Sequence, residues 1–310
     1  MNGLKLSRTY YELYGRPMLK GRFSEIFPRM AVGLAGEGSE CFGFDDQISQ
    51  DHDFGPGFCI WLPAGVFNTY GAEIQRAYNE LPKSCCGYTR SESRYGGGRV
   101  GTQSIEEFYY KHIGLHGIPS TGIQWMNVPE YHLAAVTNGE VFEDQSGEFS
   151  RIRNTLLAGY PQQVRLKKLA ENLAAMAQSG QYNYPRCRRR GDSDAAFLAR
   201  AEFVKAALKV LFLLNNRYMP FYKWAFRAAS GLEKSFDVLD MLRLLARQGE
   251  SNEYGQKSTE LIELVCVKII DALKSEKLTE ATGNFLLSHA ESVFSIISDP
   301  ELIRLGLISI

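Results

Sequence analysis

A chain of 310 residues can bury a sizeable core and is long enough for two domains. With 45% hydrophobic and 12% aromatic residues and a mean hydropathy of -0.22, its composition is that of an ordinary globular protein. Lys+Arg and Asp+Glu both total 35, so no global charge draws the chain to nucleic acid or to a membrane. Any anion site must therefore be local.

Targeting and redox signals are also absent from the sequence. No apolar run approaches the length that spans a bilayer, and the N-terminus lacks the apolar stretch of a signal peptide, so we expect a cytoplasmic protein. The six cysteines form no CxxC pair, and the adjacent Cys85 and Cys86 have the wrong spacing for a structural zinc site. We expect reduced thiols, several of them in the core.

The first elements in chain order are helices followed by a buried strand. Residues 3–27 carry apolar and aromatic positions at helical spacing, and Pro17 predicts an interruption between two helices. The short apolar run 30–36 predicts a buried strand, and the pair Gly38-Ser39 leaves it. A glycine there lets backbone N–H groups approach phosphate oxygens, and a serine hydroxyl adds a donor.

A pair of aspartates precedes the second apolar run. Asp51 and Asp53 stand before residues 54–62, which predict a second buried strand. Side chains at i and i+2 of a strand point to the same face, so the two carboxylates are expected side by side. They would repel each other unless a cation neutralises them, and Mg²⁺ takes one or two carboxylates together with substrate phosphates. This pattern predicts a Mg²⁺ (or Mn²⁺) site beside a phosphate turn.

An apolar strand, Gly-Ser, a spacer and Asp-x-Asp together resemble the nucleotidyltransferase superfamily with its polymerase-beta-like palm, and the kanamycin nucleotidyltransferases in particular. More closely, the chain resembles a bacterial family of uncharacterised proteins placed beside those enzymes. That similarity covers nearly the whole chain and rests on the segments GEGSECFGFDD, DHDFGPGFCIWLP, NGEVFEDQSGEFSRIR, GQYNYPRCRRRGD and NNRYMPFYKWAFR. The resemblance implies a fold and a nucleotide site, but no substrate.

Two departures from the pattern leave alternatives open. The residue between the paired acids is His52, where an apolar residue is usual. Three interpretations of His52 stay open: a core histidine, a phosphate contact or an outer partner of the metal. Gly55-Pro56-Gly57 suggests a bulge or a close backbone approach. A solvated acidic loop is one rival interpretation. A phosphohydrolase using His52-Asp53 is another, but it needs further histidines upstream, and His52 is the first histidine of the chain.

The rest of the first half predicts a small sheet with helices around it. Helices are expected over 64–81, 105–113 and 129–136, strands over 99–105 and 140–143, and a loop over 83–98 whose role as a lid stays open. The resemblance implies a third catalytic carboxylate on the strand beside Asp-x-Asp, and residues 99–105 contain none. Glu107 and Asp144 are the nearest candidates for a general base, although each is also explained as a solvated helix or strand end.

From residue 150 onward the sequence predicts only helices. They are expected at 150–159, 161–178, 192–215, 218–229, 233–248, 254–275, 280–296 and 298–307. We therefore expect an α+β chain, with a small mixed-sheet palm in residues 1–149 and an all-α helical bundle in residues 150–310. Lys167, Lys168 and Arg189 in the run Arg186 to Arg190 are candidates to hold a triphosphate, and a solvated basic face is the alternative.

The expected function is metal-dependent transfer of a nucleoside monophosphate from an NTP such as ATP to a hydroxyl group of an unidentified small molecule. Asp51 and Asp53 would hold the metal, while Gly38 and Ser39 would bind the phosphates. The alternative is a catalytically inactive nucleotide-binding or interaction protein on the same fold, and a scaffold without nucleotide affinity is a third reading. We expect no membrane partner, and the neutral charge argues against nucleic acid. A homodimer is left open.

Overall fold

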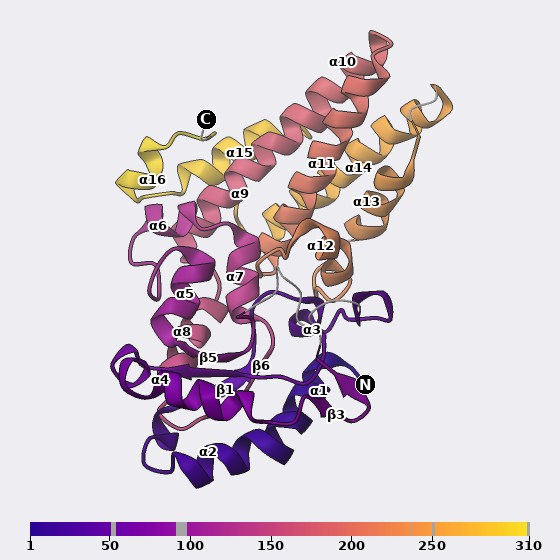
Figure 1. Cartoon of the computed structure of the whole chain (residues 1–310). Helices are drawn as coiled ribbons and strands as arrows, with labels where there is room; N and C mark the ends of the chain where they lie inside the picture. Colours follow the sequence, from indigo (N-terminus) through magenta and orange to yellow (C-terminus); the bar gives the residue numbers. More distant parts are fainter. Residues whose placement is uncertain (51–53, 91–97, 236, 250–251, 309–310) are drawn as a thin grey trace. The chain divides into compact units, whose positions relative to one another are not determined.

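The structure, a computed structural model, describes residues 1–50, 54–90, 98–235, 237–249 and 252–308. It divides the chain into two compact units (Figure 1), residues 1–119 with 128–158, and residues 120–127 with 159–310. The boundary expected after residue 149 therefore falls inside helix α8 (Glu148–Leu157), which belongs to the first unit. Phe149 explains the difference, because its ring stacks on Trp61 of the sheet at a centroid distance of 4.0 Å.

The first unit is built on a four-stranded mixed sheet with the order β5-β2-β1-β6. Its strands are β1 (Ala31–Leu34), β2 (Cys59–Leu62), β5 (Gly101–Ser104) and β6 (Glu140–Asp144). Strand β1 pairs antiparallel with β2 and β6, and β2 pairs parallel with β5. An α+β chain with a small mixed sheet is therefore confirmed. That this sheet is a nucleotidyltransferase palm stays a prediction.

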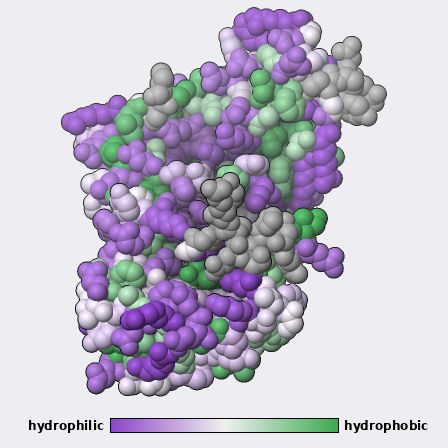
Figure 2. Space-filling view, viewed as in Figure 1, coloured by the Kyte–Doolittle hydropathy of each residue, from purple (hydrophilic) through white to green (hydrophobic). Residues whose placement is uncertain are grey.

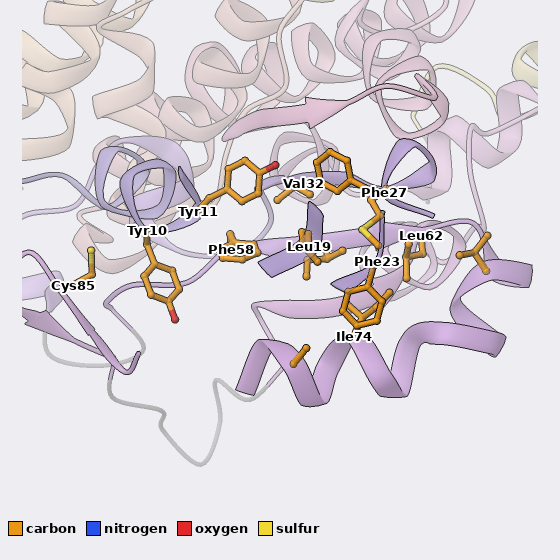
Figure 3. Close-up of a cluster of buried hydrophobic side chains, with 14 of the residues drawn as sticks. Tyr10, Tyr11, Leu19, Phe23, Phe27, Val32, Phe58, Leu62, Ile74 and Cys85 are labelled. Atoms are coloured by element: carbon orange, nitrogen blue, oxygen red, sulfur yellow. The ribbon is translucent and has the colours of Figure 1, made fainter. Parts of the chain in front are cut away.

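Both faces of the central strands are buried. Val32 and Ile60 face a core formed with helices on one side of the sheet (Figure 3). Trp61 lies between Ile60 and Leu62 in β2 and faces the other side of the sheet. The centroid of its ring is 5.4 Å from that of Phe108. Strands covered on both faces are apolar at every position, which is why these runs are continuous rather than alternating in the sequence.

Helices cover this sheet, and a small hairpin lies in the region expected to be a loop. The helical elements are α1 (Gly3–Tyr10), η1 (Tyr11–Gly15), α2 (Arg16–Arg22), η2 (Phe27–Arg29), α3 (Ser39–Phe42), η3 (Ile48–Gln50), α4 (Ala64–Asn79), α5 (Ile105–Ile113), α7 (Glu130–Thr137) and α8. The hairpin consists of β3 (Ser84–Cys85) and β4 (Tyr88–Thr89).

Pro17 does not interrupt the N-terminal helix as predicted. Elements α1, η1 and α2 follow one another without a gap from Gly3 to Arg22, and η1 is a π-helical turn. Pro17 lies in the first two positions of α2, directly after that turn. The wider π-helical turn requires no backbone hydrogen bond at the position where proline lacks an N–H group. The helix therefore continues through Pro17.

Every element that the structure describes in the second unit is a helix. These are α6 (Gly122–Asn127), α9 (Gln162–Met176), η4 (Ala177–Asn183), α10 (Tyr184–Arg189), α11 (Ser193–Leu214), α12 (Tyr222–Ala229), α13 (Val238–Arg247), α14 (Asn252–Ser275), α15 (Leu286–Ser295) and α16 (Pro300–Arg304). Helix α9 packs against both α11 and α15.

One long helical segment replaces the break that the sequence predicts between residues 178 and 192. Elements α9, η4 and α10 run continuously from Gln162 to Arg189 (Figure 1). Gly180 is a residue type that disfavours helix. Here its lack of a side chain leaves the space that the ring of Phe203 fills. Pro185 lies at the start of α10 after the π-helical turn, where its missing N–H group is tolerated.

Candidate functional site

The Gly-Ser turn follows the end of β1 and depends on two glycines. Gly36 has φ 117° and Gly38 has φ 125°, conformations that other residues rarely adopt. The side chain of Asn138 fixes the first of them, because its Oδ1 accepts the N–H of Gly36 at 2.9 Å and its Nδ2 donates to the Gly36 carbonyl at 2.7 Å. Ser39 then begins α3. A turn therefore follows β1 at this pair, and phosphate binding by it stays a prediction.

The register of β1 with β2 places the described segment that leads into β2 at the same end of the sheet as the Gly-Ser turn. Gly33 pairs with Cys59, the first residue of β2, so the chain that enters β2 lies beside the end of β1. Asp51 and Asp53, the predicted metal ligands, lie outside the described residues. The expected strand over 54–62 is confirmed only from Cys59 onward, because the five residues before it are not in the sheet.

The carboxylate of Glu40 lies against the Gly-Ser turn. A Cβ atom at Gly38 would lie 2.7 Å from each carboxylate oxygen of Glu40. Burial raises the pKa of Glu40, while the positive charges of Arg99 and Arg90 act in the opposite direction. Asp45 is nearby and its Oδ2 accepts the N–H of Gly3 at 2.9 Å, at the beginning of α1. The turn therefore has acidic and basic neighbours that were not predicted from the sequence.

Arg90 lies against the segment that follows Asp53. The residue comes directly after β4, and its N–H donates to the carbonyl of Lys83 at 3.3 Å. Its main chain lies against Gly55, and a Cβ atom at Gly57 would lie 2.7 Å from Nη1 of Arg90. Rings of Phe54 and Tyr88 meet edge to face at 5.6 Å. The Gly55-Pro56-Gly57 motif is thus a close backbone approach, as the sequence predicted.

The guanidinium of Arg90 makes few contacts with described residues. Its Nη1 donates to the carbonyl of Gly55 at the long distance of 3.4 Å. Its Nε is buried and has no hydrogen-bond partner among the described residues. Arg90 is not among the predicted site residues, because it lies in the region expected to be a loop. Gly55 and Gly57 indicate that another part of the chain packs closely against this segment. They do not indicate which residue it is.

Glu107 and Asp144 are not brought to the Gly-Ser turn. Strand β5, which pairs with β2, contains no acidic residue, and Glu107 is exposed in the first turn of α5 after it. Asp144 pairs in register with Ala31, at the opposite end of β1 from the turn. Its carboxylate accepts the N–H groups of Gly147 at 2.9 Å and Ser150 at 2.8 Å, so it stabilises the start of α8.

The basic candidates in the second unit lie far from one another. Lys167 is fully buried, and its ammonium pairs with Glu171. The Nζ of Lys168 donates to the carbonyl of Met126 at 3.4 Å and lies over the Tyr160 ring. Arg189 is exposed at the end of the same helical segment. At the helical rise of about 1.5 Å per residue it lies roughly 30 Å from the two lysines. These three residues cannot contact one triphosphate together.

His112 packs against the Gly-Ser turn from α5. Its Nε2 would lie 3.4 Å from a Cβ atom at Gly36. Burial lowers the pKa of His112 to about 4, and the negative charge of Glu37 only partly opposes this. Its Nδ1 is buried and has no hydrogen-bond partner among the described residues. The imidazole is therefore neutral at physiological pH and contributes packing rather than charge.

No alternative metal site is visible in the described part of the chain. Among the described residues, no group of three or more His, Cys, Asp or Glu side chains is arranged to hold a metal ion. The metal ligands predicted from the sequence, Asp51 and Asp53, lie outside the residues searched. Among the described helices, none combines the length and the apolar character needed to cross a membrane.

Described residues of the second unit line hollows on its surface. One, of about 420 Å³, has polar walls, and there Glu276 accepts from Arg165 at 3.1 Å and from Lys234 at 2.8 Å. Another, of about 300 Å³, is lined mostly by apolar residues of α11, α12 and α13. Figure 2 shows hydrophobic residues gathered over α11 and α13. Neither hollow is lined by Lys167, Lys168 or Arg189.

Comparison with known proteins identifies one family similarity. Residues 125–225 match a sequence family described as a domain of unknown function (DUF4037). The matched segment extends from the end of α6 through β6 and α9 into α12, so it includes neither the Gly-Ser turn nor Asp51 and Asp53. No curated protein matches the chain. The function must therefore be argued from the site.

Proposed function

We propose that the chain is a metal-dependent nucleotidyltransferase, which moves a nucleoside monophosphate from an NTP such as ATP to a hydroxyl group of a small molecule. The observation that carries this proposal is the meeting of two segments at one end of the sheet. The Gly36–Ser39 turn ends β1, and the pairing of Gly33 with Cys59 brings the chain that follows Asp53 beside it. A phosphate turn and a pair of acidic residues need this proximity to act on one substrate.

In this proposal, each residue type has a physical task. Gly38 and Ser39 bind the β and γ phosphates through backbone N–H groups and a hydroxyl. Asp51 and Asp53 hold Mg²⁺ or Mn²⁺, which neutralises charge on the phosphates. The acceptor oxygen forms a bond to the α phosphorus, the bond to the bridging oxygen breaks, and pyrophosphate leaves. Most of the rate enhancement then comes from positioning and electrostatics.

The proposal does not include the joint contact of Lys167, Lys168 and Arg189 with the triphosphate. Lys167 and Lys168 both have partners within that unit, and Arg189 is roughly 30 Å away along the helix. Charge for the phosphates is instead available in the first unit, where Arg90 and Arg99 act electrostatically on Glu40 beside Gly38. We also propose a cytoplasmic location and no nucleic-acid partner.

A second candidate is a nucleotide-binding protein without turnover. The observation that favours it is the lack of an acid on β5, the described strand beside β2 on which the resemblance implies a third carboxylate. Strand β5 has no acid, Glu107 is exposed on α5, and Asp144 is occupied at the start of α8. A transferase needs a group that accepts the proton of the acceptor hydroxyl, although an activated acceptor could release it to water.

Pyrophosphate release separates the two candidates. The purified chain is incubated with each of the four NTPs, Mg²⁺ and a panel of hydroxylated small molecules, and pyrophosphate is followed by a coupled assay. The transferase predicts acceptor-dependent release that is abolished by Asp51→Asn/Asp53→Asn. Metal-dependent NTP binding with no release for any acceptor would support the binding protein instead.

A further inference from the structure

We propose that Arg90 binds the β and γ phosphates of the nucleotide, an inference that rests on the proposed function. The first step is its position. Arg90 packs against Gly55, two residues after Asp53 in the chain, and its Nη1 lies 3.4 Å from the Gly55 carbonyl. The same arginine acts electrostatically on Glu40, whose carboxylate lies against Gly38. Arg90 is therefore close both to the chain beside the acidic pair and to the phosphate turn.

The second step is its unused hydrogen-bonding capacity. A guanidinium has five N–H donors in a planar fork. Among the described residues, the only hydrogen bond assigned to this guanidinium is the long one to Gly55, and its buried Nε has no partner there. A buried donor without an acceptor is unfavourable, because it has lost its hydrogen bonds to water without gaining others. An anion with several oxygens in fixed geometry satisfies such a fork, and phosphate is the anion that the neighbouring turn suits.

The third step is the local balance of charge. The carboxylate of Glu40 lies against Gly38, and Arg90 and Arg99 both act on it electrostatically. Asp45 is already used, because its carboxylate accepts the N–H of Gly3. Arg90 and Arg99 thus supply positive charge beside the half-buried carboxylate of Glu40. Their attraction for a ligand grows with the number of its negative charges, so it favours a triphosphate over a monophosphate.

The fourth step is how firmly the arginine is placed. The hairpin β3–β4 holds Arg90 through the bond from its N–H to Lys83. Gly57 leaves room for Nη1, and a Cβ atom there would also lie 3.2 Å from the Tyr78 hydroxyl. Because the side chain lies along a formed surface rather than in solvent, little conformational entropy is lost when it binds phosphate.

The test measures binding against phosphate number. The wild type is first titrated by calorimetry with ATP, GTP, CTP and UTP in the presence of Mg²⁺. The NTP that binds best is then compared with its diphosphate and monophosphate on wild type, Arg90→Met and Arg90→Lys. We expect Arg90→Met to weaken triphosphate binding by about tenfold or more and the monophosphate by less than about threefold, with Arg90→Lys between them.

Controls separate a binding role from a structural one. Arg22→Met removes an exposed arginine of the same unit that pairs with Glu80, and it should change none of the affinities. Equal losses for all three nucleotides in Arg90→Met would overturn the inference in favour of a structural role, and unchanged affinities would overturn it outright. Failure of the wild type to bind any NTP would instead remove the proposed function, and the inference with it.

Discussion

Arg90 occupies the space that a side chain at Gly55 would need. A Cβ atom at Gly55 would lie 2.5 Å from the Cα atom of Arg90 and 2.8 Å from its backbone nitrogen, and Gly55 has φ 141°. The contact joins the hairpin β3–β4 to the segment that follows Asp53. The position of Arg90 and the conformation of that segment are therefore linked through one glycine.

Gly55→Ala should break this link. The new methyl group meets main-chain atoms that cannot rotate away, and the residue must also hold a positive φ, so we expect a loss of at least about 2 kcal/mol in the free energy of unfolding. NTP affinity should fall as well, because the hairpin must move. Urea denaturation and calorimetry measure both.

Gly65→Ala is the matched control, because Gly65 lies in α4 with no atom within 4 Å of its Cβ position. Alanine is the better helix former, so this variant should be as stable as the wild type or more so. If Gly55→Ala proves equally harmless, the close packing of Arg90 on Gly55 is not what holds the segment.

Asn138 should be required for the Gly-Ser turn. Asn138→Leu leaves the N–H and carbonyl of Gly36 without the bonds that the amide makes to both, and we expect a loss of about 2 kcal/mol in the free energy of unfolding. NTP binding should weaken with it. Asn79→Leu removes an exposed amide that accepts from Gln75 at 2.8 Å, and should have little effect. Equal stability of the two variants would argue against a structural role for Asn138.

His112 should make the first unit less stable as the pH falls. Its folded-state pKa is about 4 and its ordinary value is 6.5. The unfolded chain therefore binds the proton more readily, and stability that is present above pH 6.5 is lost as the pH falls toward 4. The effect approaches about 3 kcal/mol. His112→Gln has no such group, so the difference in unfolding free energy between wild type and variant should change by about this amount between pH 7 and pH 4.

Trp61 provides the signal for that experiment. It is buried in the sheet of the first unit, whereas Trp125 and Trp224 belong to the second. In a Trp125→Phe/Trp224→Phe background, tryptophan fluorescence reports unfolding of the first unit alone. Carboxylates titrate in both proteins and cancel in the difference. A difference that stays constant with pH would show that His112 takes up its proton equally well in the folded chain.

Arg189→Gln should leave NTP affinity unchanged. Arg189 is exposed at the end of the continuous segment α9-η4-α10, roughly 30 Å along the helix from Lys168. Calorimetry with the NTP that binds the wild type best gives the answer. A tenfold loss of affinity would restore the basic run of the second unit as part of the nucleotide site.

The parts of the fold that were predicted from the sequence depend on local signals. Helix α5 has the expected bounds because Ser104 accepts the N–H of Glu107 at its start and Gly114, with φ 70°, ends it. Strands β1 and β2 are apolar at every position, and this pattern is independent of distant residues. The turn at Gly38 was likewise readable from its own residues.

The parts that were missed depend on residues distant in the sequence. The continuation from α9 to α10 needs the Phe203 ring over Gly180, and nothing near Gly180 indicates that partner. Arg90 belongs to the site only because the hairpin packs against Gly55. Asp144 was a candidate base because of its type, but the register with Ala31 placed it at the other end of the sheet. Residue type suggests chemistry, whereas pairing and packing decide location.

Metal-dependent NTP binding is the measurement that tests the central claim most directly. The wild type and Asp51→Asn/Asp53→Asn are titrated with each NTP by calorimetry, once with Mg²⁺ and once with EDTA. We predict binding of at least one NTP by the wild type with Mg²⁺, and its loss both in EDTA and in the double variant, because the metal joins the aspartates to the phosphates. Absence of binding by the wild type with any NTP and metal would contradict both the transferase and the nucleotide-binding protein. Binding that persists unchanged in the double variant would contradict the assigned site.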